Sequence, residues 1–293
     1  MQMNIKLSIL LALLLAGAAV PGCSAGPGRK TVPARDWTPR PGFARLSFPH
    51  DNYPREFIVQ IPKNYKPGTA YPVVFAFHGA GRTNDDWPGF LKDLSGRAEF
   101  IGIYPQGVLH AWEPVDRGKR VDDVGFTEAV LEWLGRRTEL DPAKIFALGW
   151  SLGGIFCNKL GRYSDKFAAL AAISGSFYEN PVFDPRMPRP SVLLIHGEQD
   201  GVIPFRGGIS DSGYRYEGAA DAAAIWAGHD GCGRQPEVLD LGREDITAQR
   251  YGGCRDSREV LLFRIPRGGH HLPESVEGIF ELVWDFFMRN GRE

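Results

Sequence analysis

A serine bracketed by glycines, in the segment Gly149-Trp150-Ser151-Leu152-Gly153, has the spacing of a nucleophile elbow. An apolar, β-type run at 145–148 precedes it, and a segment with helical character follows it at 152–162. A tight strand-to-helix turn of this kind holds a serine hydroxyl exposed in a strained backbone conformation. The segment therefore predicts a nucleophilic Ser151, although an ordinary Gly/Ser turn between a strand and a helix uses the same residues.

A serine hydroxyl attacks an ester only when a histidine takes its proton and a carboxylate orients that histidine. Asp200 follows the apolar run at 192–195 after a short turn, and His270 follows the run at 260–265 and two glycines. Serine, acid and histidine thus occur in the order typical of α/β-hydrolases, each after a different predicted strand. We therefore predict Asp200 as the acid and His270 as the base.

Other residues compete for these two roles. Asp200 also suits an Asx-turn, and Asp211 and Asp221 are the alternative acids. His271 directly follows His270, and we expect it to be a neighbour that supports the site rather than the base. We expect His196, which precedes the acid loop, to be a structural hydrogen-bonding residue. The remaining histidines have no motif around them and are expected in surface or loop positions: His50, His110 and His229.

The negative charge of a tetrahedral intermediate needs two N–H donors. We expect one from Leu152, at the start of the helix, and one from Ala80, in the glycine-containing turn 77–81. A plain glycine turn is the alternative interpretation of that segment. Trp112 and Trp150 are candidates for stacking on an aryl acyl group of the substrate, and packing is an equally good explanation of both.

Short apolar runs alternate with helical segments along the chain. This pattern predicts an α/β fold with a mostly parallel, doubly wound sheet covered by helices on both faces. We expect the Pro-rich stretch 180–190 to be a loop, either a cap over the site or a surface excursion. The predicted strands are 55–61, 73–77, 101–104, 145–148, 168–173, 192–195 and 260–265, and the predicted helices are 123–137, 152–162, 218–227 and 275–288.

The chain has 293 residues, of which 43% are hydrophobic and 24% charged, with a formal net charge of −1. This is the composition of a globular domain, and the near-zero charge argues against nucleic acid as a partner. Residues 1–23 have the pattern of a secretory signal peptide, with Lys6 before the apolar run 7–20. Residues 24–43 are expected to be a flexible linker, and residues 44–293 a single catalytic domain.

The cysteines bear on location and on stability. Cys23 ends a segment that resembles a bacterial lipoprotein cleavage box, which predicts lipidation, with ordinary cleavage as the alternative. Cys157 is expected to be buried in the core. In an oxidising compartment Cys232 and Cys254 are the natural disulfide pair, although sequence alone does not determine connectivity. No cluster has zinc-ligand spacing, and we expect neither a metal nor a cofactor.

A set of short segments spread along the chain has a recognisable combined pattern: 77–79, 104–107, 121–126, 149–154, 196–200, 203–208, 230–232, 251–254 and 268–270. Taken together, these segments resemble the secreted esterase family of α/β-hydrolases that includes poly(3-hydroxybutyrate) depolymerases and feruloyl esterases. The resemblance implies Ser151, Asp200 and His270 as a catalytic triad and supports the Cys232–Cys254 pairing.

Two positions depart from the pattern of this family. Leu152 stands where asparagine is common. The base is usually followed by a Trp-Pro pair, whereas His271-Leu272-Pro273 follows it here. Both changes affect the rim of the site and leave the substrate open. No separate substrate-binding domain is recognisable, which argues against crystalline polyester as the substrate.

We therefore expect an extracytoplasmic, monomeric serine esterase, secreted or lipid-anchored, that hydrolyses a small or oligomeric ester through an acyl-enzyme. A serine peptidase on the same fold is the first alternative. A non-catalytic surface binding protein that retains the fold is the second.

Overall fold

The computed structural model describes residues 31–113, 121–178, 181–187, 189–210 and 213–292. The predicted signal peptide and the predicted lipidation site Cys23 lie outside these residues. So do Asp211 and parts of the Pro-rich stretch 180–190. Within the described residues, no helix combines the length and the apolar character needed to cross a bilayer.

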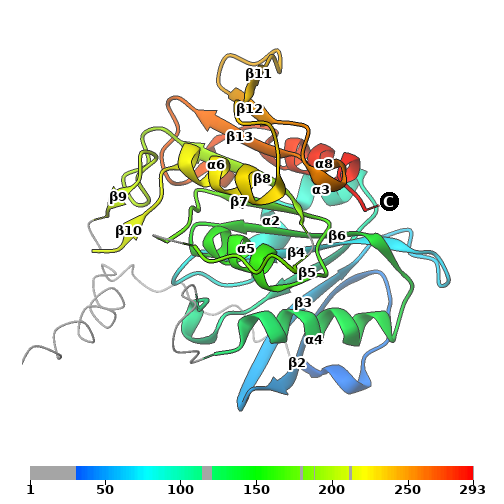
Figure 1. The fold of residues 1–293 in the computed structure, drawn as a ribbon. Coiled ribbons are helices and arrows are strands. Elements are labelled where there is room, and N and C mark those ends of the chain that lie inside the picture. The colour runs from blue at the N-terminus through cyan, green and yellow to red at the C-terminus, as the bar shows by residue number, and fades with distance from the viewer. Residues whose placement is uncertain (1–30, 114–120, 179–180, 188, 211–212, 293) are drawn as a thin grey trace, which may run out of the picture.

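The described part of the chain forms one eleven-stranded sheet, in which six consecutive strands run parallel (Figure 1). Short apolar sequences form these strands because both of their faces are covered. In spatial order the parallel strands are β5 (Ile101–Pro105), β4 (Tyr71–Phe77), β6 (Leu140–Trp150), β7 (Ala169–Ile173), β8 (Ser191–Gly197) and β13 (Val260–Ile265).

Antiparallel strands extend this parallel core on both sides, and Figure 1 shows β2 at one end of the sheet and β11 at the other. On one side lie β3 (Tyr53–Ile61) and β2 (Gly42–His50), followed by the short β1 (Val32–Pro33). On the other side lie β12 (Thr247–Tyr251) and β11 (Glu237–Leu239). A separate hairpin is formed by β9 (Gly208–Ile209) and β10 (Arg215–Tyr216).

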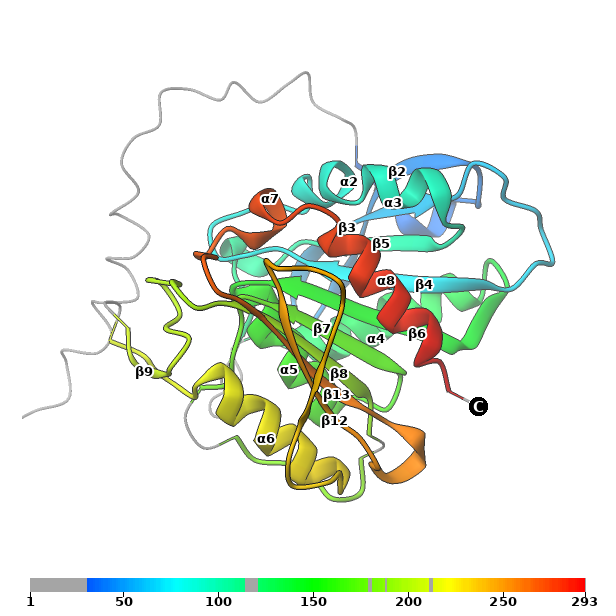
Figure 2. The ribbon, with the colours of Figure 1, turned by 90° about the horizontal axis from the view of Figure 1, so that it is seen from above.

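Helices cover both faces of the sheet (Figure 2). Strand β8 shows how the chain serves both layers, because Val192 and Leu194 pack on one face while Leu193 and Ile195 pack on the other. The first face holds α4 (Asp123–Gly135), α5 (Leu152–Tyr163) and α6 (Ala219–Asp230), and the second holds α2 (Asp86–Phe90), α3 (Lys92–Arg97), α7 (Leu272–Ser275) and α8 (Ile279–Arg289).

The predicted doubly wound, mostly parallel sheet is confirmed, and each predicted strand and helix overlaps an observed one. The predicted closing helix 275–288 is divided into α7 and α8, with Gly278 at φ 71° before α8. The sequence pattern missed β2, the antiparallel strands β11 and β12, and the short helices α2 and α3. These elements are short or alternate only weakly, so their periodicity carries little signal.

The prediction of a flexible linker through residue 43 is wrong for residues 32–43. Ala34 and Trp37 are buried, and the Trp37 ring packs against Trp133 of α4 with 5.2 Å between the ring centroids. The Trp133 indole N–H donates to the Ala34 carbonyl at 3.2 Å. The Pro- and Arg-rich composition concealed these two anchors, because composition records nothing about long-range packing.

Candidate active site

Ser151 lies between the end of β6 and the start of α5, at the carboxyl edge of the parallel strands. Its backbone has φ 57° and ψ −123°, a conformation that a non-glycine residue adopts only when its surroundings impose it. The neighbouring glycines explain why the turn is possible. A Cβ on Gly149 would lie 2.1 Å from the Gly153 carbonyl oxygen, and one on Gly153 would lie 2.0 Å from that of Phe77.

A continuous chain of hydrogen bonds joins the predicted nucleophile, base and acid. His270 Nε2 lies 2.8 Å from Ser151 Oγ, and His270 Nδ1 lies 2.8 Å from Asp200 Oδ2. An ionised carboxylate only accepts hydrogen bonds, so Nδ1 donates its proton to Asp200 and leaves Nε2 to accept from the serine hydroxyl. The side chains are 9% exposed for His270 and fully buried for Asp200. This geometry can transfer a proton away from the serine.

Asp200 is held as a charged group by its surroundings. Burial would raise the pKa of its carboxyl. Hydrogen bonds from His196 and His270 and from the backbone outweigh burial and hold the pKa below its ordinary value. The backbone N–H groups of Val202 and Ile203 both donate to Oδ1, at 2.8 and 2.9 Å. The Asx-turn that competed with the catalytic interpretation is therefore present, and the same carboxylate also binds His270.

The other candidates for acid and base lie elsewhere. Asp221 is exposed on the first turn of α6. The His271 side chain is 62% exposed and contacts Glu274 at 4.0 Å. His196 is buried, and its Nε2 donates to the Ile203 carbonyl at 2.8 Å, 3.4 Å from Asp200 Oδ2. His196 thus supports the acid loop from below, as predicted.

The two tryptophans predicted to bind substrate are both packed inside the protein, so the prediction that they stack on substrate is wrong. Trp112 is 2% exposed and Trp150 is 4% exposed. Trp150 Nε1 donates to the backbone carbonyl of His270 at 2.9 Å, which makes it a positioning residue for the base. Trp112 Nε1 donates to the backbone carbonyl of His78 at 2.8 Å. Packing, the equal alternative in the sequence, is the outcome for both.

The turn that carries Ala80 lies directly against the nucleophile. A Cβ on Gly79 would be 3.3 Å from the Cβ of Ser151. The next residue is Ala80, and the N–H of Gly81 beyond it is bound to the His110 carbonyl at 2.8 Å. Among the backbone hydrogen bonds found in loops and turns of the described residues, none is donated by the N–H groups of Leu152 and Ala80. Both N–H groups therefore remain candidates for holding an oxyanion.

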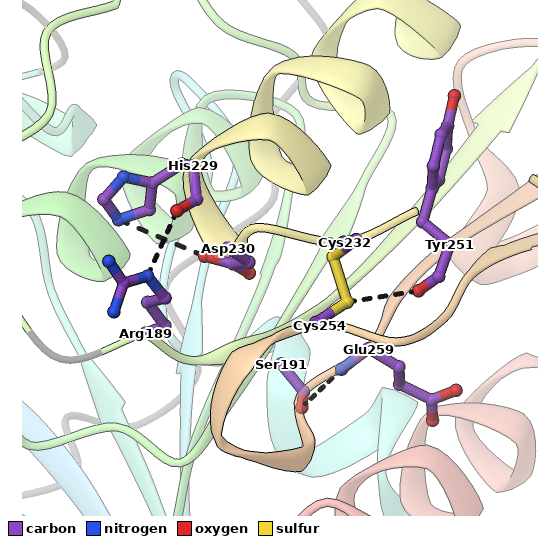
Figure 3. The surroundings of a disulfide bond; sticks show 8 residues. All are labelled: Arg189, Ser191, His229, Asp230, Cys232, Tyr251, Cys254 and Glu259. Carbon is purple, nitrogen blue, oxygen red and sulfur yellow. Dashed lines mark hydrogen bonds and ion pairs between the residues drawn. A yellow bond between two sulfur atoms is a disulfide. The ribbon is translucent and has the colours of Figure 1, made fainter. Parts of the chain in front are cut away.

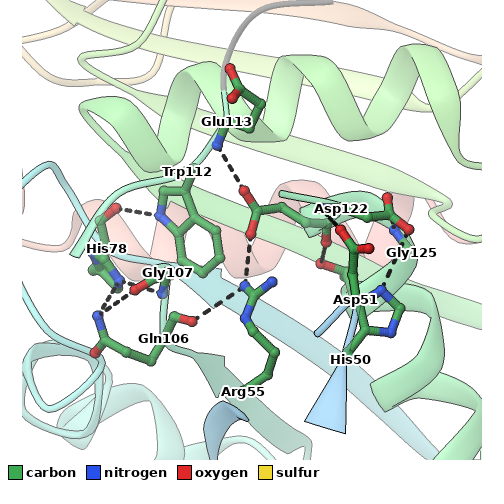
Figure 4. Close-up of polar contacts among 12 residues, drawn as sticks. His50, Asp51, Arg55, His78, Gln106, Gly107, Trp112, Glu113, Asp122 and Gly125 are labelled. Carbon is green, nitrogen blue, oxygen red and sulfur yellow. Dashed lines mark hydrogen bonds and ion pairs between the residues drawn. The ribbon is translucent and has the colours of Figure 1, made fainter. Parts of the chain in front are cut away.

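His78 organises this turn, and sequence reasoning did not assign it a role (Figure 4). Its Nδ1 donates to the Gly79 carbonyl at 2.8 Å, and its Nε2 accepts from Gly107 N at 3.0 Å and from Gln106 Nε2 at 2.9 Å. Burial lowers the pKa of His78 to about 4, so the ring stays neutral and keeps this arrangement at neutral pH. The run Phe77-His78-Gly79 directly after a predicted strand is the sequence feature that could have identified His78 as part of the site.

A buried ion pair lies behind this network. Arg55 is 1% exposed and Asp123 is 3% exposed, and Nη2 of the arginine lies 2.7 Å from Oδ1 of the aspartate. The same guanidinium donates to the Gln106 carbonyl at 3.4 Å, and Asp123 Oδ2 accepts from Glu113 N at 2.7 Å. The pair therefore ties together the segments on either side of Trp112. Sequence reasoning noted the motif around Asp123 without identifying this partner.

The predicted disulfide between Cys232 and Cys254 is confirmed (Figure 3). Cys157 is free and buried in α5, as expected. In the Pro-rich loop, Phe183 packs on Trp226 and His229 of α6, with ring centroids 5.0 and 4.4 Å apart. The Arg162 guanidinium near the end of α5 also donates to the Val182 carbonyl at 3.0 Å, so this part of the loop is anchored to the ends of α5 and α6. Among the described residues, no cluster of three or more His, Cys, Asp or Glu side chains is arranged to hold a metal.

The chain is similar in sequence to proteins named as esterases. No family model matches the chain. It is 27% identical to feruloyl esterase B of Piromyces equi over 79% of its own length, and it spans 44% of that protein. It is 26% identical to the probable feruloyl esterase C of Aspergillus niger and 27% identical to feruloyl esterase C of Emericella nidulans. Those two alignments cover 80% of this chain and 84% of each relative.

Solved structures share the fold. The acetyl xylan esterase from Aspergillus awamori superposes with a TM-score of 0.61 at 19% identity, covering 80% of this chain and 94% of that one. A ferulic acid esterase gives a TM-score of 0.55 at 18% identity, covering 85% of this chain and 97% of that one. Together they show that this chain has an α/β-hydrolase fold.

Proposed function

We propose that this chain, which is similar to feruloyl esterases over 80% of its length and shares the α/β-hydrolase fold, is a carboxylic ester hydrolase that works through an acyl-enzyme on Ser151. The observation that carries the proposal is the unbroken hydrogen-bond chain from Ser151 Oγ through His270 to Asp200. The strained backbone at Ser151 supports it, since a structural serine has no need of that conformation.

The reaction begins when Ser151 Oγ attacks the ester carbonyl carbon and His270 Nε2 takes the hydroxyl proton. The carbonyl oxygen becomes an oxyanion that accepts hydrogen bonds from the N–H groups of Leu152 and Ala80. One such donor is worth about 10²- to 10³-fold in kcat. As the intermediate collapses, the bond to the alcohol oxygen breaks and His270 returns the proton to the leaving alcohol.

Water completes the cycle. His270 removes a proton from a water molecule, which attacks the acyl-enzyme, and the carboxylic acid leaves as Ser151 regains its proton. Asp200 remains ionised throughout and stabilises the imidazolium that forms twice in each turnover. The partners that hold the pKa of Asp200 low suit this task.

We propose an aryl ester of the feruloyl type as the substrate, on the strength of the relatives named as feruloyl esterases. An acetyl ester of xylan is the second candidate, because a solved structure with the same fold is an acetyl xylan esterase. The two candidates differ greatly in the size of the acyl group. Comparing kcat/KM for methyl ferulate and for acetylated xylan decides between them.

We further propose that the enzyme acts outside the cytoplasm. The disulfide Cys232–Cys254 suits an oxidising compartment, and residues 1–23 have the pattern of a secretory signal. A lipid anchor on Cys23 is the finer form of this proposal. Expressing the full chain and its Cys23→Ser variant in a bacterium, then comparing membrane and soluble fractions, tests it: only the wild-type chain should remain with the membrane.

The test of the mechanism is the variant Ser151→Ala. It should lose ester hydrolysis and labelling by a fluorophosphonate probe, while its thermal unfolding midpoint stays within a few degrees of the wild type. Retained hydrolysis in this variant contradicts the acyl-enzyme on Ser151. A wild-type enzyme that cleaves a peptide amide faster than the matching ester contradicts the esterase assignment in favour of a peptidase.

A further inference from the structure

A small aromatic cluster lies beside the nucleophile, apart from the two large cores of the sheet. Three of its members are tyrosines that no catalytic step uses. The cluster consists of buried Ile155, Ile203 and Tyr216, with the partly buried Leu152, Tyr178 and Tyr214 packed against them.

The chain positions of these residues place the cluster at the reacting edge of the sheet. Leu152 follows Ser151 directly, and Ile203 belongs to the loop whose backbone N–H groups bind Asp200. Tyr178 follows the carboxyl end of β7, the strand that neighbours β6. Tyr214 directly precedes β10 in the small hairpin beyond the acid loop. Four separate segments thus bring apolar and aromatic surface to the side of the nucleophile.

The rings of Tyr178, Tyr214 and Tyr216 contact one another and form a continuous aromatic wall. Tyr178 stacks on Tyr216 with 5.1 Å between centroids and 25° between planes, and it meets Tyr214 at 5.4 Å and 49°. A backbone bridge between Tyr178 and Tyr216 fixes the first pair. Tyr214 is the outer member, because it is less buried than Tyr216, which is 8% exposed. An outer ring that is supported from behind is a ready surface for another planar ring.

The wall is uncharged at working pH. Burial raises the pKa of both Tyr178 and Tyr214, and the nearby Glu113 carboxylate adds to each shift. The hydroxyl groups therefore remain protonated, and the Tyr178 hydroxyl shares a hydrogen bond with Tyr216. The buried Trp112 and Trp150 offer no comparable face, because both rings are enclosed by protein.

We propose that Tyr214, supported by Tyr178 and Leu152, is a specificity-determining residue that packs against the aryl ring of the ester. The inference rests on the proposed function, since it takes Ser151 as the nucleophile. The aryl ring can belong to the acid or to the alcohol of the ester. Both share the same chemistry, a flat apolar ring within reach of a tyrosine face, and the substrates below separate them.

The experiment compares three esters with the full-length enzyme. Methyl ferulate carries its ring in the acid, phenyl acetate carries it in the alcohol, and ethyl acetate has no ring. The variants are Tyr214→Leu, which removes the ring, and Tyr214→Phe, which keeps it. Tyr53→Leu is the matched control, because Tyr53 is 36% exposed at the start of β3 and belongs to no part of the cluster.

We expect Tyr214→Leu to lower kcat/KM roughly ten-fold for at least one of the two aryl esters, chiefly through KM, because one aromatic contact is lost. Ethyl acetate should change less than about two-fold, and Tyr214→Phe and Tyr53→Leu should resemble the wild type. A loss confined to methyl ferulate assigns the wall to the acid, and a loss confined to phenyl acetate assigns it to the alcohol.

Two results overturn the inference while leaving the esterase assignment in place. One is an equal loss on ethyl acetate in Tyr214→Leu, which indicates general damage to the site. The other is an unchanged kcat/KM for both aryl esters. A wild-type enzyme that hydrolyses none of the three esters overturns the proposed function itself, so the two failures are distinguishable.

Discussion

Asp200 and Asp230 are both buried carboxylates, and they lie at opposite edges of the same sheet. Asp200 follows the carboxyl end of β8 and accepts hydrogen bonds from His270 and from two backbone N–H groups, and His196 Nε2 lies 3.4 Å from its Oδ2. Asp230 ends α6 next to the disulfide, near Arg189, which precedes β8 (Figure 3). Their burial is nearly the same, and their surroundings differ in every other respect.

Neither carboxylate oxygen of Asp230 has a hydrogen-bond partner among the described residues. His229 Nε2 lies 4.0 Å from Oδ1, and the Arg189 guanidinium donates to the His229 carbonyl instead. Burial raises the pKa of Asp230 to about 7, against the opposing effect of Arg189 and Arg258. At Asp200 the hydrogen bonds outweigh burial and the pKa is lowered.

Burial alone therefore does not determine whether an acidic side chain is charged at neutral pH. At the carboxyl edge of the strands, loop N–H groups and two histidines replace the water that burial removes, so the charge is retained for catalysis. At the amino edge, no hydrogen-bond donor among the described residues replaces the lost water around Asp230, so its carboxyl favours the neutral form. One position suits chemistry, and the other reduces the stability of the fold as the pH rises.

The largest expected effect comes from removing each charge in turn. Asp200→Asn should lower kcat by about 10³- to 10⁴-fold, because an amide can hold the His270 ring in the wrong tautomer. Asp230→Asn should keep kcat within about two-fold. Both variants are assayed with the same ester at pH 7.5. Comparable losses of kcat in the two variants would contradict the assignment of a catalytic role to Asp200 and not to Asp230.

The next effect is on stability, and its sign follows from the pKa shift. The pKa of Asp230 is about 7 in the folded protein against 3.8 for the ordinary group, so between these values the folded state binds a proton that the unfolded state lacks. Stability from this residue is complete below pH 4 and is lost as the pH rises through 7. The loss is on the order of 4 kcal/mol at most, or about 1.4 kcal/mol per pH unit.

Urea unfolding of the wild type and of Asp230→Asn between pH 4 and pH 8 measures this loss. The variant should gain stability relative to the wild type as the pH rises. Asp200→Asn should show no such trend over this range, and its difference from the wild type should change only below pH 4. The lowered pKa of Asp200 stabilises the fold above pH 4, and that stability is lost as the pH falls further. A pH-independent difference for Asp230→Asn would show that its carboxyl is solvated or paired.

The disulfide tests the amino edge separately. Cys232 and Cys254 are 22 residues apart, so replacing both by serine should cost roughly 3 kcal/mol of unfolding free energy, mainly by freeing the unfolded chain. Activity at 25 °C should persist, because the bond lies far from Ser151. Urea unfolding and a kcat measurement on the same preparation check both statements. Loss of kcat in a fully folded variant would mean that the two edges are coupled.

The smallest effect concerns how the base is held. Trp150→Phe keeps an aromatic ring but loses the N–H that donates to the His270 carbonyl, so kcat should fall about ten-fold with little change in KM. Trp226→Phe is the matched control, since Trp226 is equally buried and its N–H donates to Asn158, away from the reacting groups. Equal losses in the two variants would reduce Trp150 to ordinary packing.

Much of the site followed from the order of residues along the chain. Ser151, Asp200 and His270 each come after a continuous apolar run, and parallel strands bring their carboxyl ends to one edge. The same reasoning predicted the turn with Ala80 and the pairing of Cys232 with Cys254. Residues 32–43 and the antiparallel strands β11 and β12 were less predictable, because their anchoring depends on partners distant in sequence.

The sequence is therefore sufficient to predict the type of reaction and the sheet that carries the reacting residues, since both predictions depend on local motifs and their order. Only the tertiary structure decided which side chains face the reacting atoms. It buried Trp112 and Trp150, gathered Tyr178 and Tyr214 into one cluster with Leu152, and left the Asp230 carboxylate without a hydrogen-bond partner among the described residues. These outcomes depend on contacts between segments that are far apart in the chain. Burial changes the free energy of a side chain only when the chain has folded and those segments are in contact.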